Sequence, residues 1–277
     1  MKLQLQVITN DADYSTITVG DSKFTDDTWD LAPFILAKTI QDCKKKLCFD
    51  FIKNEHMKLT VKLYAYHKLG QIKPRSVQVK ITRLRSFIEY CNLNNIDSIA
   101  EITKEDFLNF AMWLKEEKKL SARTGYSNCS IVEEIIKLGQ IKGWDVPKIN
   151  IFVGMRSQDL WQIKKTLNIT KPIPEDIFDK ILYYALNKET NILIKAGIII
   201  QSQTGLRINE VLSIKKGCVH TTIEGHDYME VIVTKTDKDP NPALHKVFIN
   251  DLVKNTIKEF WNIQRNYDTK VVLKNCL

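Results

Sequence analysis

Residues 204–212 read Thr204-Gly205-Leu206-Arg207-Ile208-Asn209-Glu210-Val211-Leu212. The preceding residues, 191–204, leave almost no polar face, which predicts a helix buried in a core. Gly205 allows a sharp break after that helix. Arg207 and Glu210 stand three positions apart, so on a following helix they share one face and can present a braced guanidinium to a phosphate. From these residues alone, the alternative is a structural surface pair worth under about 1 kcal/mol.

The segments around this stretch predict helices and one hairpin. Upstream, Pro174-Glu175-Asp176 supplies the proline and the acids that a helix N-terminus prefers, so a helix is expected over residues 177–186. Downstream, residues 228–234 and 246–249 alternate like the strands of a hairpin joined by a polar turn. Residues 251–267 are expected to form a closing helix.

The middle of the chain predicts short helices and shows no strand signal. An amphipathic helix is expected over residues 76–91. Thr103 and Asp106 form a capping-box start for a second helix, and Ser121 is a candidate cap for a third. Residues 154–170 follow as a basic connector.

The first part of the chain is less distinct. Residues 1–30 mix β-prone runs with Asp-rich turns and indicate a small or extended N-terminal arm. The apolar positions of residues 31–69 fit an amphipathic helix rather than a strand. Within it, Lys44-Lys45-Lys46 is interpreted as a solvated helical turn.

The 277 residues exceed the usual ~100–200 of one domain, so two or three domains are expected. Lys-Pro pairs near positions 73 and 171 divide the chain into residues 1–72, 73–170 and 171–277. The net charge of +8 is uneven, because the middle part carries 16 basic and 11 acidic side chains. This excess suggests a polyanion partner, since phosphate neutralisation supplies most non-specific nucleic-acid affinity. A solvated lysine-rich face is the alternative.

Composition excludes several classes of protein. With 44% hydrophobic residues, the chain can bury ordinary cores, so it is not mostly disordered or fibrous. No apolar stretch approaches the ~18 residues that span a bilayer, and the N-terminus lacks the apolar region of a secretory signal. A cytoplasmic protein without membrane contact is therefore expected.

The six cysteines are scattered and form no C-x-x-C pair, and no histidine lies at zinc-finger distance from a pair of them. They are Cys43, Cys48, Cys91, Cys129, Cys218 and Cys276. We therefore expect reduced thiols and no metal site.

The stretch Thr204-Gly205-Leu206-Arg207-x-x-Glu210-Val211-Leu212 resembles the first arginine motif of the tyrosine recombinase (phage integrase) family. The ordered context agrees over about residues 73–270, with a basic helical domain before the motif and a hairpin after it. The resemblance implies a mainly α fold with a small β-hairpin or sheet. In it, a helical core-binding (SAM-like) domain precedes the N-terminal part of a tyrosine-recombinase catalytic domain.

The resemblance also implies roles for individual residues. Arg207 would clamp the scissile phosphate and stabilise the charge that develops there, and Glu210 would position the active site. Lys235, on the hairpin, would protonate the leaving 5′ oxygen as general acid, with Lys238 as the alternative because turn lengths vary. Strand exchange in this family requires no metal or other cofactor.

Two parts of the family pattern are missing. The family has a downstream His-x-x-Arg motif and, later still, a tyrosine that attacks the phosphate. None of the later histidines has an arginine at the third position beyond it: His220, His226 and His245 lead to Ile223, Met229 and Phe248. Tyr228 and Tyr267 come too early to be the nucleophile. We therefore expect the chain to be truncated and inactive in DNA cleavage by itself.

In the family, the two domains form a C-shaped clamp around duplex DNA. The contacts expected here are basic or aromatic side chains of the middle domain: Arg75, Lys80, Arg83, Lys118, Lys119, Arg123 and Tyr126. Contacts to phosphates position a protein without specifying sequence.

The expected function is site-specific recombination or integration by a recombinase of a mobile element. Such a protein would bind double-stranded DNA and assemble on it with copies of itself. One alternative is a non-catalytic DNA-binding accessory protein or regulator derived from the same family. The other is a helical protein-interaction module.

Overall fold

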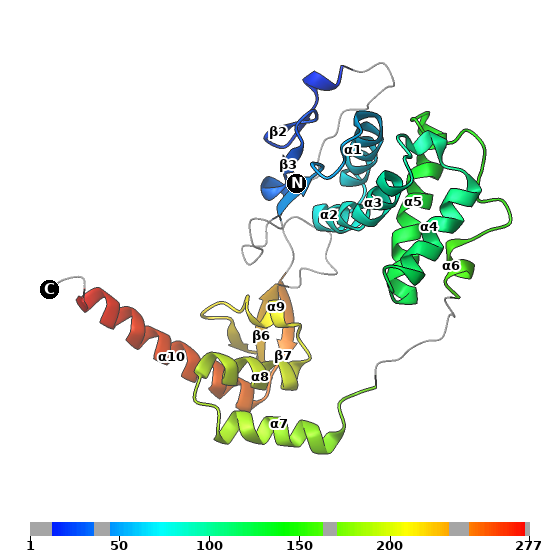
Figure 1. Cartoon of the computed structure of the whole chain (residues 1–277). Helices are drawn as coiled ribbons and strands as arrows, with labels where there is room; N and C mark the ends of the chain where they lie inside the picture. The colour runs from blue at the N-terminus through cyan, green and yellow to red at the C-terminus, as the bar shows by residue number, and fades with distance from the viewer. Residues whose placement is uncertain (1–12, 36–44, 163–170, 233–243, 275–277) are drawn as a thin grey trace. The chain divides into compact units, whose positions relative to one another are not determined.

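The computed structural model describes residues 13–35, 45–162, 171–232 and 244–274, with side chains of the last helix described as far as residue 262. The chain divides into two compact units, Met1–Leu167 and Asn168–Leu277 (Figure 1). Both units are built mainly from α-helices and carry small antiparallel sheets. This confirms the mainly α fold class with a small sheet that the sequence predicts.

The described part of unit 1 holds six α-helices and two short strand pairs. The helices are α1 (Glu55–Leu69), α2 (Pro74–Arg83), α3 (Arg85–Leu93), α4 (Lys104–Glu116), α5 (Ala122–Lys142) and α6 (Ser157–Leu160). The antiparallel pairs are β1 (Thr18–Val19) with β2 (Ser22–Lys23), and β3 (Thr28–Asp30) with β4 (Lys46–Cys48). Single 3-10 turns lie at Tyr14–Thr16, Ala32–Phe34 and Ile99–Glu101.

The helices of the middle segment begin where the sequence places caps. Thr103 and Asp106 make the expected capping box at the start of α4. The Ser121 hydroxyl accepts the amide of Thr124 at the start of α5. The helix expected over residues 76–91 is present as α2 and α3, which meet at the buried Leu84.

The helix expected over residues 31–69 is wrong for the described residues that precede Glu55. Residues 46–48 form β4, so Lys46 lies in a strand and not in a solvated helical turn. Helix α1 begins only at Glu55, because the Asn54 side chain accepts the amides of the first turn and so fixes the N-terminus there. Pairing with β3, earlier in the chain, overrides the helical spacing of the apolar residues.

Unit 1 has one hydrophobic core, to which residues from Ile17 to Trp161 contribute. Trp29 of β3, Tyr64 of α1, Phe110 of α4 and Ile136 of α5 are all fully buried in it. Side chains from the first 72 residues therefore pack into the same core as the helices that follow.

Trp161 closes this core from the segment that the sequence suggests is a connector. The indole is 6% exposed, and its Nε1–H donates to the Cys129 sulfur of α5 at 3.2 Å. The ring lies against Gly125, where an added β-carbon would stand 2.1 Å from the ring atom Cη2 of Trp161. Glycine is thus required at this position by close packing, because any side chain would overlap the indole.

A partly buried carboxylate joins three helices of unit 1. Glu134 of α5 accepts the Tyr64 hydroxyl of α1 at 2.6 Å and pairs with Lys68 of α1 at 2.7 Å. It also pairs with Lys80 of α2. Partial burial alone would raise the pKa of the Glu134 carboxyl, but the hydrogen bonds from Lys68, Lys80 and Tyr64 outweigh it and lower that pKa to about 2.

Unit 2 packs three helices and a short one with a three-stranded sheet. The helices are α7 (Glu175–Asn187), α8 (Ile192–Thr204), α9 (Ile208–Val211) and α10 (Asp251–Lys274). The antiparallel sheet has the order β5-β6-β7, with β5 at Val219–Thr221, β6 at Asp227–Ile232 and β7 at Leu244–Phe248. Strands β6 and β7 confirm the two hairpin strands expected from the sequence, and the expected turn between them lies largely outside the described residues.

Helix α8 is only partly buried, which corrects the expectation of a helix enclosed in a core. It packs against α7 and α10, and its Ala196, Ile199 and Ile200 are buried. Leu193 and Ile194 are 62% and 50% exposed, because these two helices cover part of its circumference and not all of it.

Glu134 should make unit 1 sensitive to acid. Because its pKa is lower in the folded chain than the ordinary value of 4.5, its contribution to stability is present above about pH 4.5 and is lost as the pH falls toward 2. We expect Glu134→Gln to lower the free energy of unfolding at pH 7 by about 2 kcal/mol and to flatten its acid dependence. Urea unfolding followed by tryptophan fluorescence tests this, since Trp29, Trp113, Trp144 and Trp161 lie in unit 1.

The matched control is Glu116→Gln, because Glu116 is exposed at the end of α4 and has no hydrogen-bond or ion-pair partner within the described residues. It should leave both the stability and its acid dependence unchanged. Equal behaviour of the two variants would contradict the role given to Glu134.

Gly125→Ala should displace the Trp161 ring. The methyl group would overlap the indole, so we expect a loss of about 2–3 kcal/mol in the free energy of unfolding. The same displacement should uncover the buried Cys129 thiol, and alkylation of Cys129 by iodoacetamide in the native chain measures it. Gly154→Ala is the control. No atom lies within 4 Å of a β-carbon added at Gly154, so this variant strains the left-handed backbone without a steric overlap. Equal Cys129 labelling in the two variants would show that packing against Trp161 is not the cause.

Candidate phosphate site and nucleic-acid interface

Arg207 lies at the turn between α8 and α9. Helix α8 ends at Gly205, whose left-handed backbone (φ +66°) turns the chain and whose amide still bonds to the carbonyl of Gln201 at 3.0 Å. The next residue, Leu206, is 8% exposed and anchors the turn in the core of unit 2. Arg207 is the N-cap residue of α9, and its side chain is about half exposed.

Glu210 holds Arg207 with both carboxylate oxygens. Its Oε2 accepts the backbone amide of Arg207 at 2.9 Å, and its Oε1 accepts Nη1 of the guanidinium at 2.9 Å. The Glu210 side chain is only 5% exposed, against 49% for Arg207. Within the described residues, Nε and Nη2 of Arg207 have no partner, so the guanidinium is fixed at one end and open to a ligand at the other.

Charge near Glu210 keeps it ionised. Burial alone would raise the pKa of its carboxyl, but the backbone and side-chain hydrogen bonds from Arg207 and the attraction of Arg207 and His245 lower it overall. A buried carboxylate with this environment stays negative at neutral pH and keeps the arginine in place. The sequence correctly predicts that Arg207 and Glu210 are neighbours. It does not predict the influence of His245 on Glu210, because His245 is considered only for a His-x-x-Arg motif that it does not form.

The other sequence-predicted residues of unit 2 are not brought to this site. Lys235 and Lys238 lie in residues 233–243, outside the described residues. Tyr228 lies three positions before Val231 on β6, so it faces the opposite side of the sheet from that core residue. There it packs against His220 and Lys246, whose Nζ is 4.8 Å from the Tyr228 ring centroid.

Four of the seven predicted DNA contacts in unit 1 already have protein partners. Lys80 pairs with Glu134, and Arg75 bonds to Gln78. Lys118 pairs with Glu89 at 2.6 Å and lies over the Trp113 ring, and Tyr126 accepts a hydrogen bond from Gln158 at 3.3 Å.

The remaining three are open to solvent. Arg83 ends α2, Lys119 lies in the turn after α4, and Arg123 lies in the first turn of α5. All three are exposed, and their side chains have no hydrogen-bond or ion-pair partner among the residues the structure describes. They are therefore the members of the predicted set whose charge is most available to a phosphate.

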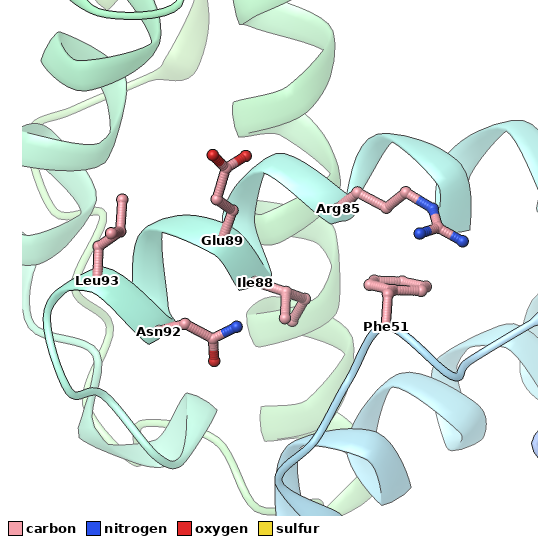
Figure 2. Close-up of a pocket in the computed structure, with 6 residues that line it drawn as sticks. All are labelled: Phe51, Arg85, Ile88, Glu89, Asn92 and Leu93. Atoms are coloured by element: carbon pink, nitrogen blue, oxygen red, sulfur yellow. The ribbon is translucent and has the colours of Figure 1, made fainter.

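A shallow pocket of about 320 Å³ lies on α3 of unit 1 (Figure 2). The Arg85 guanidinium stacks over the Phe51 ring at 4.3 Å from its centroid, and Leu93 stands at the other end. Glu89 at its rim is paired with Lys118. The charged groups of this pocket are thus engaged by the protein itself and do not converge on a bound molecule.

No described helix is long and apolar enough to cross a membrane. No group of three or more His, Cys, Asp or Glu side chains in the described segments is arranged to hold a metal ion.

No family model matches the chain, and no curated protein matches it. Among solved structures, the XerH site-specific recombinase bound to palindromic difH substrate, a post-cleavage complex, matches with a TM-score of 0.50 at 16% identity. The match covers 78% of this chain and 65% of that one. The chain has a tyrosine recombinase-like fold.

A second complex gives the same result. The XerH site-specific recombinase bound to difH substrate, in a pre-cleavage state, matches with a TM-score of 0.50 at 15% identity. This match covers 79% of the chain and 64% of the recombinase, so the chain spans about two thirds of the length of the proteins it resembles. At this identity the likeness establishes the shared fold.

Glu210→Gln tests the link between the carboxylate and the α9 turn. A glutamine amide has only one acceptor oxygen, so it cannot keep both Arg207 hydrogen bonds, and we expect unit 2 to lose about 1–2 kcal/mol of stability around α9. Hydrogen exchange followed by mass spectrometry should show faster exchange of the amides at residues 207–212. The control is Glu224→Gln, an exposed residue with no partner within the described residues. Equal exchange in the two variants would contradict the bracing role.

Proposed function

We propose that this chain binds duplex DNA as a tyrosine recombinase, acting in site-specific recombination or integration of a mobile element. One observation carries the proposal: a half-exposed arginine, held by a buried carboxylate, follows α8 in a fold that matches XerH recombinase bound to difH substrate. Such a protein would work in the cytoplasm and assemble with copies of itself on its DNA site.

The geometry suits capture of a phosphodiester. The open Nε and Nη2 of Arg207 would donate to the two non-bridging oxygens of the scissile phosphate, as a guanidinium fork matches phosphate geometry. Because Glu210 already fixes the other end of the guanidinium, little side-chain freedom would be lost on binding. The same arrangement would stabilise negative charge that builds up on the phosphate during attack.

Lys235 is proposed as the general acid that protonates the leaving 5′ oxygen, with Lys238 as the alternative. No residue of this chain is assigned as the nucleophile, so the proposal for the chain itself is duplex binding and capture of one phosphate. In unit 1, Arg83, Lys119 and Arg123 are proposed as phosphate contacts that fix the position of the duplex.

A second candidate is a non-catalytic accessory protein or regulator derived from the same family. The observation that favours it is the absence of arginine at the third position after His220, His226 and His245. It shares the duplex binding and the captured phosphate, and it differs only in strand cleavage. A covalent DNA–protein species, seen on denaturing electrophoresis after incubation with duplex, would exclude this second candidate and would show that the chain contains a nucleophile.

Duplex binding should depend on Arg83 and Arg123. We expect the affinity for a short labelled duplex to fall steeply with salt, because binding releases counterions from the phosphates. Arg83→Ala and Arg123→Ala should each reduce the slope of log Kobs against log salt by about 1. Fluorescence anisotropy at several salt concentrations measures both effects.

The control variant is Lys142→Ala. Lys142 is also exposed on α5, but it lies at the opposite end of this 21-residue helix from Arg123. It should leave affinity and slope unchanged. A chain that does not bind duplex even at about 50 mM salt would contradict the proposal and favour a protein-interaction module.

A further inference from the structure

His245 lies on the inner face of the unit 2 sheet. In the β6–β7 ladder it is the direct partner of Val231, and cross-strand partners carry their side chains on the same face. Val231 is 2% exposed and belongs to the core that also contains Leu206 and Val211, the apolar residues on either side of the Arg207 turn. His245, the second residue of β7, shares this face and is exposed to solvent.

This placement brings His245 near the Arg207–Glu210 pair. Its charge is one of the influences that favour the ionised form of Glu210, as that of Arg207 is. Glu210 is therefore a buried carboxylate influenced by two cationic side chains that are both accessible from solvent.

The charged sheet residues next to Val231 and His245 belong to the opposite face. Glu230 and Lys246 are cross-strand partners one position away from Val231 and His245, so they point away from the core. His220 also belongs to that outer face, where its Nε2 lies 3.7 Å from Glu230 and its ring contacts Tyr228. On the face of Val231 and His245, Asp227 lies at the far end of β6 and pairs with Lys254 of α10. The Glu210 carboxylate, which is held by Arg207, is the acidic group influenced by His245.

We infer that His245 is a second phosphate-binding residue of the Arg207 site and donates from its protonated imidazole to the same phosphodiester. The inference rests on the proposed function and adds a residue to it. Arg207 and Glu210 together carry no net charge, so the pair alone attracts an anion weakly. A protonated His245 gives the site a net charge of +1. Capture of the phosphate is therefore strengthened on mild acidification.

His245→Gln tests this in the full 277-residue chain. Binding to a labelled duplex of arbitrary sequence is measured by anisotropy over a range of salt at about pH 6 and about pH 8. At about pH 6 we expect the variant to bind roughly fivefold more weakly than the unmodified chain, with a salt slope smaller by about 1. At about pH 8 we expect the two to bind alike, which also shows that the variant is folded.

His220→Gln is the matched control, because His220 is an exposed sheet histidine on the opposite face. It should keep the affinity and the salt slope of the unmodified chain at both pH values. Combining His245→Gln with Arg207→Ala adds a second readout. If both side chains hold one phosphate, the two losses at about pH 6 will not add.

The outcomes separate the inference from the proposed function. If the unmodified chain binds duplex and His245→Gln behaves identically at both pH values, the inference is overturned and the proposed function stands. Additive losses with Arg207→Ala would likewise show that the two residues do not share a phosphate. Absence of duplex binding by the unmodified chain at either pH would overturn both.

Discussion

Each unit of this protein depends on a partly or fully buried carboxylate that must keep its cationic partners. In unit 1, Glu134 accepts a hydrogen bond from Tyr64 and forms ion pairs with Lys68 and Lys80, and these contacts fix α1, α2 and α5 against one another. In unit 2, Glu210 fixes the turn that presents an arginine. Removing one partner from a buried ion pair is costly, because the remaining charge has no water to replace it. The same physical constraint therefore maintains helix packing in one unit and a ligand-facing guanidinium in the other.

The sequence predicts those features whose causes are local. The caps at Thr103 and Ser121 and the Arg207–Glu210 pair each depend on residues three positions apart, and all are found. Strand β4 was missed because its partner β3 lies earlier in the chain, although the alternation of Lys46, Leu47 and Cys48 is strand-like. Lys80 could not be recognised as an internal partner, since Glu134 is 54 residues away in sequence.

Tertiary pairing also changes what the charge excess of the middle segment means. Lys80 and Lys118, and Lys137 of α5, are paired with carboxylates of the same unit. Surface pairs of this kind contribute little to stability, but they hold the lysine head groups near acidic neighbours. The positive potential available to a polyanion is therefore narrower than a count of basic residues indicates.

The contact between Trp161 and Gly125 has a consequence for how such sequences can diverge. An indole occupies the space of the missing side chain, and its nitrogen bonds to the Cys129 thiol on the same helix. A larger residue at position 125 is compatible with this packing only if position 161 becomes smaller in the same lineage. The two sites should therefore vary together in homologous chains. A glycine on the fifth helix together with a tryptophan just beyond the sixth would identify relatives whose helical core is closed by the same contact.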